Sequence, residues 1–171
     1  MQIRKVVPDE AGPLAALWLR SRAASVPAIP PTVHTDEEVH RWFEEIVLPR
    51  REVWVVDRGG ELVALMVLDR NWIDQLYVEP SMWGMGMGGA LVEYAMGLRP
   101  AGLKLWTFQS NLGARRFYEA RGFFVTAMTA GDNEERAPDV CYEWSSSRSR
   151  PAGRGTAGSR VSGASNGQHR S

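Results

Sequence analysis

A glycine-rich turn at residues 84–89 carries the clearest chemical signal in the chain, because four of its six residues are glycine. Without a Cβ, glycine lets successive backbone N–H groups point together at an anion. The helical pattern directly behind the turn adds unpaired N–H groups and the positive end of a helix dipole. A flexible turn without a ligand is the plainer alternative, but the helix behind it favours an anion site. We therefore expect a phosphate or pyrophosphate to bind at Gly84, Met85, Gly86, Met87, Gly88 and Gly89.

Three phosphate-binding motifs compete for this turn. The P-loop is excluded because no Gly-Lys-Ser/Thr closes the turn. The dinucleotide fingerprint matches literally as Gly84-x-Gly86-x-x-Gly89, but it lies well beyond the end of the predicted strand, and the next strand ends without the expected acid. The segment Trp83-x-x-Gly86-x-Gly88 fits a third motif better. It resembles the Q/R-x-x-G-x-G/A coenzyme A loop of the GNAT superfamily of N-acetyltransferases.

Two further segments extend this resemblance, and both lie in the family's order and at its spacing. They are Ile73-Asp74-Gln75-Leu76-Tyr77-Val78-x-Pro80, similar to the family's fourth strand, and Asn111-x-x-Ala114-Arg115-x-Phe117-Tyr118-x-x-x-Gly122-Phe123, similar to its strand-5 to helix-4 signature. The likeness covers roughly residues 2–144. It implies transfer of an acetyl group from acetyl-CoA to a primary amine of a small molecule or protein, by direct attack in a ternary complex.

The chain departs from the family at Trp83, where arginine or glutamine is usual. The change removes a charge-assisted contact with the coenzyme, worth about 1.5–3 kcal/mol. Two outcomes stay open: weaker coenzyme binding, or an indole ring that packs on the pantetheine arm or the adenine. The backbone donors of the glycine turn do not depend on this side chain.

Acetyl transfer from a thioester requires that the carbonyl be polarised and the leaving thiolate be protonated. The resemblance implies that backbone N–H groups of Leu76 and Val78 face the thioester oxygen, as in an oxyanion hole. It also places the family's general acid at Tyr118. A phenol with a pKa near 10 can donate to a thiolate whose conjugate pKa is about 8.5. The alternative for Tyr118 is a second core aromatic whose hydroxyl is bonded locally.

Two more polar residues fall inside the segments that resemble the family. Asp74 lies within a predicted central strand, where a carboxylate is costly unless it is paired or functional. It is either the base or anchor for the acceptor amine, or a structural partner of an arginine or backbone donor. Asn111 precedes a predicted helix and suits its N-cap. The resemblance also implies that Asn111 contacts the pantetheine arm, and both roles stay open.

The acceptor side is less defined. A proline-containing loop over residues 23–34 is long enough to border the acceptor site, or it is a plain surface connection. A charged cluster, Glu134, Glu135, Arg136 and Asp139, reads as a solvated face, with acceptor recognition as the alternative.

The three histidines lack metal-ligand spacing, so no metal is expected. Cys141 has no supporting histidine motif and is not expected to be a nucleophile.

The remaining pattern predicts the elements that position these residues. We expect a mixed α/β fold, a GNAT-like central and mostly antiparallel sheet of about seven strands flanked by four helices. Arg58-Gly59-Gly60 marks a hairpin turn. Thr35-x-x-Glu38 is a capping box for a helix that we expect to end before Pro49. The predicted strands are 3–7, 52–57, 62–69, 73–78, 103–108, 123–129 and 140–144.

Composition bounds the domain and its partners. Residues 1–144 suit one GNAT-like domain, and the Ser/Gly/Arg-rich segment 145–171 reads as a disordered tail. Five of the 20 basic residues lie in that tail, so the domain carries 15 basic and 20 acidic residues. A charge near −5 argues against nucleic acid as the main ligand and suits a cationic amine. No apolar run could span a membrane, no secretory signal is evident, and one cysteine fits a cytoplasmic protein. The sequence leaves open whether the protein forms a homodimer.

Two other functions remain as alternatives to acetyl transfer. A non-catalytic acyl-CoA sensor or interaction module could use the same fold and the same glycine turn. A nucleotide-dependent oxidoreductase would explain the literal dinucleotide fingerprint, but the missing acid makes this alternative remote.

Overall fold

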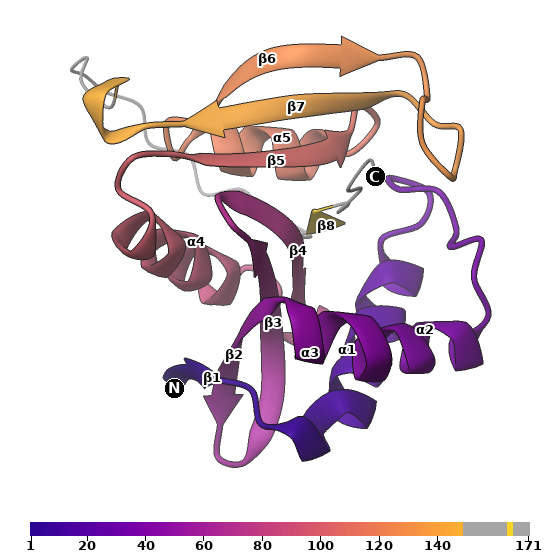
Figure 1. Cartoon of the computed structure of the whole chain (residues 1–171). Coiled ribbons are helices and arrows are strands. Elements are labelled where there is room, and N and C mark those ends of the chain that lie inside the picture. The colour runs from indigo at the N-terminus through magenta and orange to yellow at the C-terminus, as the bar shows by residue number, and fades with distance from the viewer. Residues whose placement is uncertain (149–163, 166–171) are drawn as a thin grey trace.

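The computed structural model describes residues 1–148 and the backbone of residues 164–165. The strands of the sheet lie in the order β1-β2-β3-β4-β5-β7-β6, with β8 paired to β4 (Figure 1). Among the strands of the described residues, only the β4–β5 pair is parallel. The predicted mixed sheet of seven main strands is therefore confirmed. The strands are β1 (Gln2–Lys5), β2 (Glu52–Arg58), β3 (Glu61–Asp69), β4 (Trp72–Val78), β5 (Leu103–Phe108), β6 (Phe124–Thr129), β7 (Asp139–Trp144) and β8 (Ala164–Ser165).

The helices cover both faces of the sheet and form the four predicted helical bodies. They are α1 (Ala11–Ala24), the continuous α2 (Asp36–Trp42), η2 (Phe43–Val47) and α3 (Leu48–Arg50), then α4 (Met87–Leu98) and α5 (Leu112–Glu119). On one face, α1 and the α2–α3 body pack on β2, β3 and β4. On the other face, α4 and α5 enclose a second core with residues of β3, β4 and β5 (Figure 1). The strand β4 contributes to both cores.

The β2–β3 hairpin shows how local sequence determines local structure. Its turn consists of Gly59 and Gly60, with φ of 67° and 89°. Both values lie in the left-handed region that two-residue hairpin turns require and that glycine adopts without steric cost. The predicted hairpin is confirmed.

The helix that follows Thr35 begins as predicted but ends later. Thr35 accepts a hydrogen bond from the Glu38 amide, and the Glu38 side chain bonds back, so the capping box is confirmed. The expected end before Pro49 is wrong, because the helix continues to Arg50. A π-helical turn precedes Pro49, and the Leu48 amide donates to Phe43. The wider turn shifts the hydrogen-bond pattern, so the missing amide and the ring of Pro49 no longer conflict with the preceding turn.

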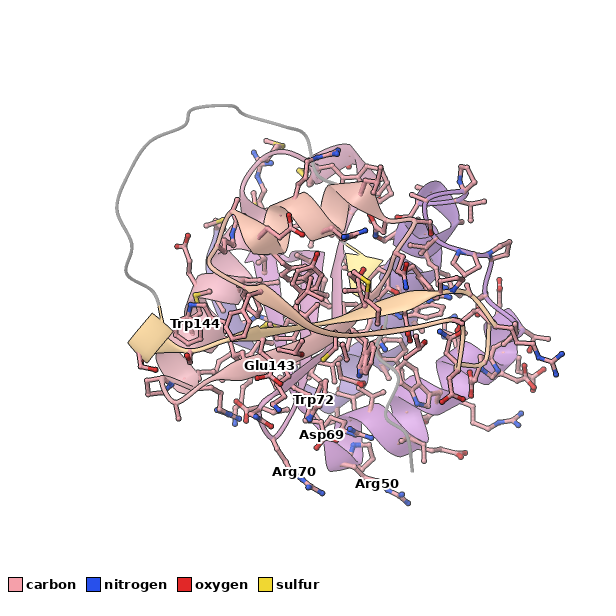
Figure 2. The ribbon with its side chains drawn as sticks, turned by 90° about the horizontal axis from the view of Figure 1, so that it is seen from above. Arg50, Asp69, Arg70, Trp72, Glu143 and Trp144 are labelled. Atoms are coloured by element: carbon pink, nitrogen blue, oxygen red, sulfur yellow. The ribbon has the colours of Figure 1, made fainter. Side chains whose placement is uncertain are left out.

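The strands β4 and β5 pair at one end only. Their register contains a single pair, Trp72 with Lys104. Lys104 also forms an ion pair of 2.8 Å with Glu143 on β7, and Figure 2 shows Trp72 and Glu143 at this end of the molecule. Beyond Trp72 the edge of β4 is left without β5. The sheet therefore opens into a wedge between its two halves.

Part of the predicted tail is described. Ser146–Arg148 form a short 3-10 helix, and β8 pairs antiparallel with β4 through Leu76 with Ser165 and Tyr77 with Ala164. The expectation of disorder for the rest of the tail falls on residues 149–163 and 166–171, outside the described residues. Among the helices described, none is both long and apolar enough to cross a bilayer.

Candidate active site

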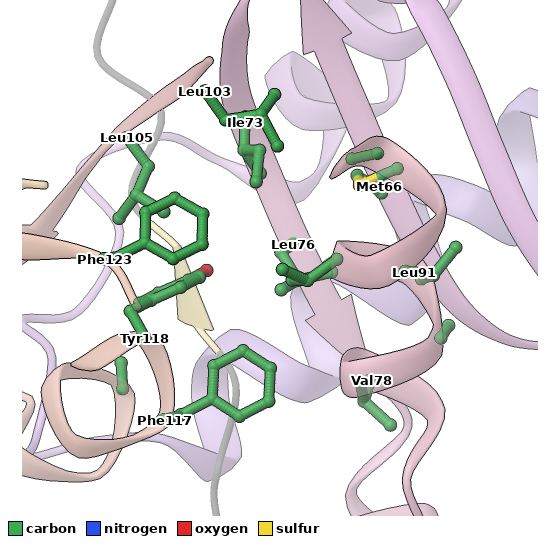
Figure 3. Close-up of a cluster of buried hydrophobic side chains, with 14 of the residues drawn as sticks. Met66, Ile73, Leu76, Val78, Leu91, Leu103, Leu105, Phe117, Tyr118 and Phe123 are labelled. Carbon is green, nitrogen blue, oxygen red and sulfur yellow. The ribbon is translucent and has the colours of Figure 1, made fainter. Parts of the chain in front are cut away.

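The wedge beside β4 brings several predicted site residues together. The register between β3 and β4 shifts by one residue, so that Val67 faces Gln75 while Leu68 faces Ile73. This bulge contains Asp74. The β4 edge beyond it, with Leu76 and the final residue Val78, lies opposite the α5 side of the wedge (Figure 3). A strand edge without a neighbouring main strand can present backbone N–H groups to a ligand.

The strand β8 occupies part of this edge. It pairs with Leu76 and Tyr77 from within the wedge, between β4 and β5. The edge is therefore able to bind an extended chain. The roles predicted for the Leu76 and Val78 amides in polarising a thioester remain predictions.

The glycine turn meets the geometric requirements of an anion site. The amides of Met87, Gly88 and Gly89 begin α4 and have no backbone or side-chain acceptor among the described residues. Gly86 is the N-cap residue, with φ of 86°, and Gly84 has φ of 78°. A Cβ at Gly86 would meet no atom within 4 Å, so the turn faces open space there. Three unpaired donors and a helix dipole thus converge on one region.

Gly88 and Gly89 have different surroundings. A Cβ at Gly88 would lie 3.6 Å from both Phe117 and Val78, an ordinary contact. A Cβ at Gly89 would lie 2.5 Å from Nη2 of Arg121. Glycine at position 89 therefore allows the Arg121 guanidinium to approach, whereas Gly88 has no such steric demand from the protein itself.

Trp83 links the glycine turn to the end of β4. Its indole Nε1 donates to the Val78 carbonyl at 2.9 Å, and its ring is half-buried against the core between α4 and the sheet. The indole thus holds the start of the turn in place. Stacking of Trp83 on the pantetheine arm or adenine remains a prediction.

Tyr118 is buried on α5, with 1% of its surface exposed. Its ring centroid lies 5.0 Å from that of Phe117 and 5.4 Å from that of Phe123. Both adjacent aromatics of α5 are therefore buried. Figure 3 shows the Tyr118 hydroxyl pointing across the wedge toward Leu76, and Phe117 pointing toward Val78. This orientation suits the proton donor that the sequence predicts, and that role remains a prediction.

Asp74 and the two residues that follow it on β4 are buried. Asp74 is 7% exposed. Gln75 accepts a hydrogen bond of 2.9 Å from the Trp18 indole, which explains an amide inside a central strand. Burial raises the pKa of the Tyr77 phenol, while Arg22, which donates to its oxygen at 3.3 Å, opposes the rise. The choice between a catalytic and a structural role for Asp74 stays a prediction.

Asn111 caps α5. Its Oδ1 accepts a hydrogen bond of 3.0 Å from the Ala114 amide, so the predicted capping role is confirmed. The side chain is 1% exposed. A contact between Asn111 and the pantetheine arm remains a prediction.

The charged loop between β6 and β7 is partly buried, which corrects its assignment as a solvated face. Glu135 is buried, and its Oε1 lies 2.5 Å from Nη2 of Arg22. Asp139 is 3% exposed and accepts hydrogen bonds from Thr129 and Asn133. These carboxylates are buried because they have hydrogen-bonding partners, which a charge run in the sequence does not reveal.

The same loop contacts the proline-containing loop after α1. His34 Nε2 lies 2.9 Å from Glu134. Ser110, between β5 and α5, also contacts the proline-containing loop, since its Oγ donates to the Ala28 carbonyl at 2.8 Å. Together with the ion pair of Arg22 and Glu135, these contacts join α1, its following loop and the β6–β7 loop on one side of the wedge. The sequence predicted two separate loops, and the structure packs them against each other.

Two arginines near the site were missed by sequence reasoning. Arg22 is buried between the rings of Trp18 and Phe108, and the guanidinium of Arg121 lies beside the first turn of α4. For Arg22 a signal existed, because it follows Leu14 and Trp18 at helical spacing on the core-facing side of α1. No signal in the sequence places Arg121 beside Gly89.

Among the described residues, no group of three or more histidine, cysteine or acidic side chains could hold a metal ion.

Comparisons with known proteins agree with this geometry. A model of the acetyltransferase (GNAT) family matches residues 18–123. The peptidyl-lysine N-acetyltransferase YjaB of Salmonella typhimurium is 32% identical over 137 residues, which cover 78% of this chain and 90% of that protein. The peptidyl-lysine N-acetyltransferase YiaC of Escherichia coli is 26% identical over 149 residues, covering 83% and 95% of the two chains.

A solved structure is similar to this chain as well. The solution structure of apo YjaB from Escherichia coli superposes with a TM-score of 0.68 at 28% identity, covering 83% of this chain and 95% of that one. These relatives do not favour a non-catalytic sensor or an oxidoreductase. The fold, the wedge and the family match over residues 18–123 show that this chain belongs to the GNAT family of acetyltransferases and is an N-acetyltransferase.

Proposed function

We propose that this enzyme transfers the acetyl group of acetyl-CoA to the side-chain amine of lysine residues in proteins. Residues 1–144 form its catalytic domain, and its compartment is the cytoplasm, where acetyl-CoA and reduced cysteine both occur. Acetyl-CoA as the donor follows from the family, and a protein lysine follows from the names of YjaB and YiaC. The acidic balance of residues 1–144 suits a cationic acceptor.

The observation that carries the proposal is the separation of β4 from β5 beyond Trp72. It leaves one strand edge facing a wedge that has the glycine turn at one end and Tyr118 on its far side. The unpaired amides of Met87, Gly88 and Gly89 suit the pyrophosphate of the coenzyme. The fit supports coenzyme A rather than a neutral ligand.

The chemistry divides among residues of this chain. Backbone N–H groups at Leu76 and Val78 stabilise the negative charge that develops on the thioester oxygen during attack by the amine. Tyr118 donates its phenolic proton to the departing thiolate. Asp74 accepts a proton from the acceptor amine or holds that amine in place. The resemblance to the family and the positions of these residues around the wedge support each assignment.

Access of the acceptor depends on the two loops that pack against each other beside α1. The buried pair of Arg22 and Glu135 joins the β6–β7 loop to α1, and the surface pair of His34 and Glu134 joins the two loops. A lysine side chain is long and unbranched, so it can reach past such loops while the rest of the protein substrate stays outside. The loops therefore border the acceptor path in this proposal.

The test uses the purified full chain with acetyl-CoA and peptides whose only amine is one lysine, the N-terminus being blocked. Mass spectrometry should show a single added acetyl group on lysine, formed faster than with heat-denatured enzyme. A matched peptide with a free N-terminus and no lysine tests the alternative acceptor. Acetylation of that peptide or of small amines alone would contradict the lysine assignment. If the chain does not bind acetyl-CoA, the assignment of acetyl-CoA as the donor is wrong.

A further inference from the structure

Arg121 occupies an unusual position between two helices. It follows the C-terminal end of α5, and its guanidinium lies against the first turn of α4, where Nη2 would be 2.5 Å from a Cβ at Gly89. The N-terminal end of a helix carries a partial positive charge, so a cation placed there is unfavourable without an anion nearby. A guanidinium beside three unpaired amides is therefore a concentration of positive charge.

The partners of Arg121 account for only part of its side chain. Nη1 donates to the Phe117 carbonyl at 3.0 Å, and Cζ lies 3.9 Å from the centroid of the Phe117 ring. Nε is inaccessible to solvent and has no hydrogen-bond partner, and no carboxylate lies within ion-pair distance of this arginine in the described part of the chain. Burial lowers the pKa of the guanidinium, and Glu93 on α4 opposes this effect.

A purely structural role explains part of this arrangement. A cation near the end of α5 stabilises that helix by interacting with its last carbonyls, and the bond to Phe117 is of that kind. It does not explain why Nη2 faces α4 at Gly89, where a Cβ would lie 2.5 Å from it. Glycine at this position leaves room for a positive charge beside the glycine turn.

Trp83 supplies the complementary observation. The family's coenzyme loop usually carries arginine or glutamine at this position, but here the indole is engaged with the Val78 carbonyl. The indole at position 83 thus offers no charge to an anion, while the Arg121 guanidinium reaches the first turn of α4 from beyond the end of α5.

We propose that Arg121 binds a phosphate group of the coenzyme at the start of α4 and compensates for the side chain that Trp83 does not provide. Glycine at position 89 leaves room for this guanidinium. The inference rests on the proposed function, because it takes acetyl-CoA as the donor. Coenzyme A carries phosphate at two positions, its pyrophosphate and its 3′-phosphate, and a guanidinium can pair with either.

The test compares Arg121→Gln with the matched control Arg116→Gln, which removes an exposed arginine from α5, the helix that Arg121 follows. Calorimetry should show that Arg121→Gln weakens coenzyme A binding by about ten- to a hundredfold, as expected for loss of a charge-assisted contact. Arg116→Gln should bind within about twofold of the unmodified chain. Arg121→Lys keeps the charge but not the planar fork, and its affinity should fall between the two.

Acetyl-pantetheine, which carries no phosphate, separates binding from folding. Its KM should be the same for the unmodified chain and Arg121→Gln. If Arg121→Gln affects acetyl-pantetheine as much as acetyl-CoA, or leaves coenzyme A affinity unchanged, Arg121 is a structural cap and the inference is wrong. Dephospho-CoA then identifies the source: a deficit that persists points to the pyrophosphate, and one that vanishes points to the 3′-phosphate. An unmodified chain that does not bind coenzyme A would instead overturn the proposed donor.

Discussion

The indole of Trp83 and the carbonyl of Val78 are joined by a hydrogen bond of 2.9 Å that fixes the glycine turn to the end of β4. This bond spans only five positions of the chain but sets where α4 begins relative to the strand edge. The residue that departs from the family's coenzyme loop thus has a structural use. It holds the amides that we propose to bind an anion in a defined place beside the wedge.

Replacing Trp83 with phenylalanine should isolate this hydrogen bond. The ring keeps most of its packing, while the loss of one bond costs about 0.5–1.5 kcal/mol. We expect a small fall in the melting temperature and a several-fold rise in the KM for acetyl-CoA, with kcat nearly unchanged. Trp54→Phe is the control, because Trp54 donates to Glu52 away from the turn. An equal rise of KM in both variants would show that the bond has no special role.

Gly88 offers a sharper test of the anion site than Gly86. A side chain at Gly86 is strained by its φ of 86°, whereas a Cβ at Gly88 makes only ordinary contacts. Gly88→Ala should therefore fold and bind acetyl-CoA within a few-fold, and Gly88→Val should bind at least tenfold more weakly because its γ carbons crowd the amides. Calorimetry and melting curves measure both effects.

Gly97→Ala provides the control for helix propensity, because it lies later in α4 with open space around it. It should leave coenzyme affinity unchanged. A Gly88→Val variant that folds and still binds acetyl-CoA with normal affinity would remove this turn from the coenzyme site.

Elements formed by neighbouring residues could be predicted from the sequence. The turn at Gly59-Gly60, the capping box at Thr35 and the N-cap at Asn111 all depend on contacts within a few positions. The sequence could not predict the ion pair of Arg22 and Glu135, because these residues are 113 positions apart. Which charges are buried depends on how distant segments pack, and this information is absent from local patterns.

The tail gives a prediction that involves the strand edge directly. Ending the chain after Trp144 removes two residue pairs between β8 and β4, so thermal stability should change little. The KM for acetyl-CoA should fall, because β8 covers the edge at Leu76 that the coenzyme is proposed to use. Ala164→Pro in the full chain should act in the same direction, since proline cannot donate to a strand. A higher KM in either variant would contradict this competition.

Asp74 can be assigned by the pH dependence of its loss. Asp74→Asn should lower the rate more at acid than at alkaline pH, because a lysine amine with a pKa near 10.4 needs less help as the pH approaches that value. Rates measured from pH 6 to 10 decide between a base and other roles. A deficit that does not vary with pH would mean that Asp74 positions the acceptor or supports the bulge between β3 and β4.

Tyr118 and Tyr142 form a matched pair for testing the general acid. Both phenols are buried, with ring centroids 6.3 Å apart, but the Tyr142 hydroxyl donates to Glu119 at 2.5 Å and Tyr118 points toward Leu76 (Figure 3). Tyr118→Phe keeps the ring packing against Phe117, so the fold and acetyl-CoA affinity should be retained. The kcat should fall about 10²-fold, the low end for loss of a general acid.

Tyr142→Phe should lower the melting temperature through the loss of its bonds and leave kcat within about twofold. Steady-state kinetics with the lysine peptide measure both variants, and a viscosity series shows whether the chemical step limits turnover. If chemistry is limiting and Tyr118→Phe keeps its kcat within twofold, Tyr118 is a packing residue and solvent protonates the thiolate. If both variants lose activity equally, the two hydroxyl groups affect how α5 packs against β7. The proton donor is then another group around the wedge.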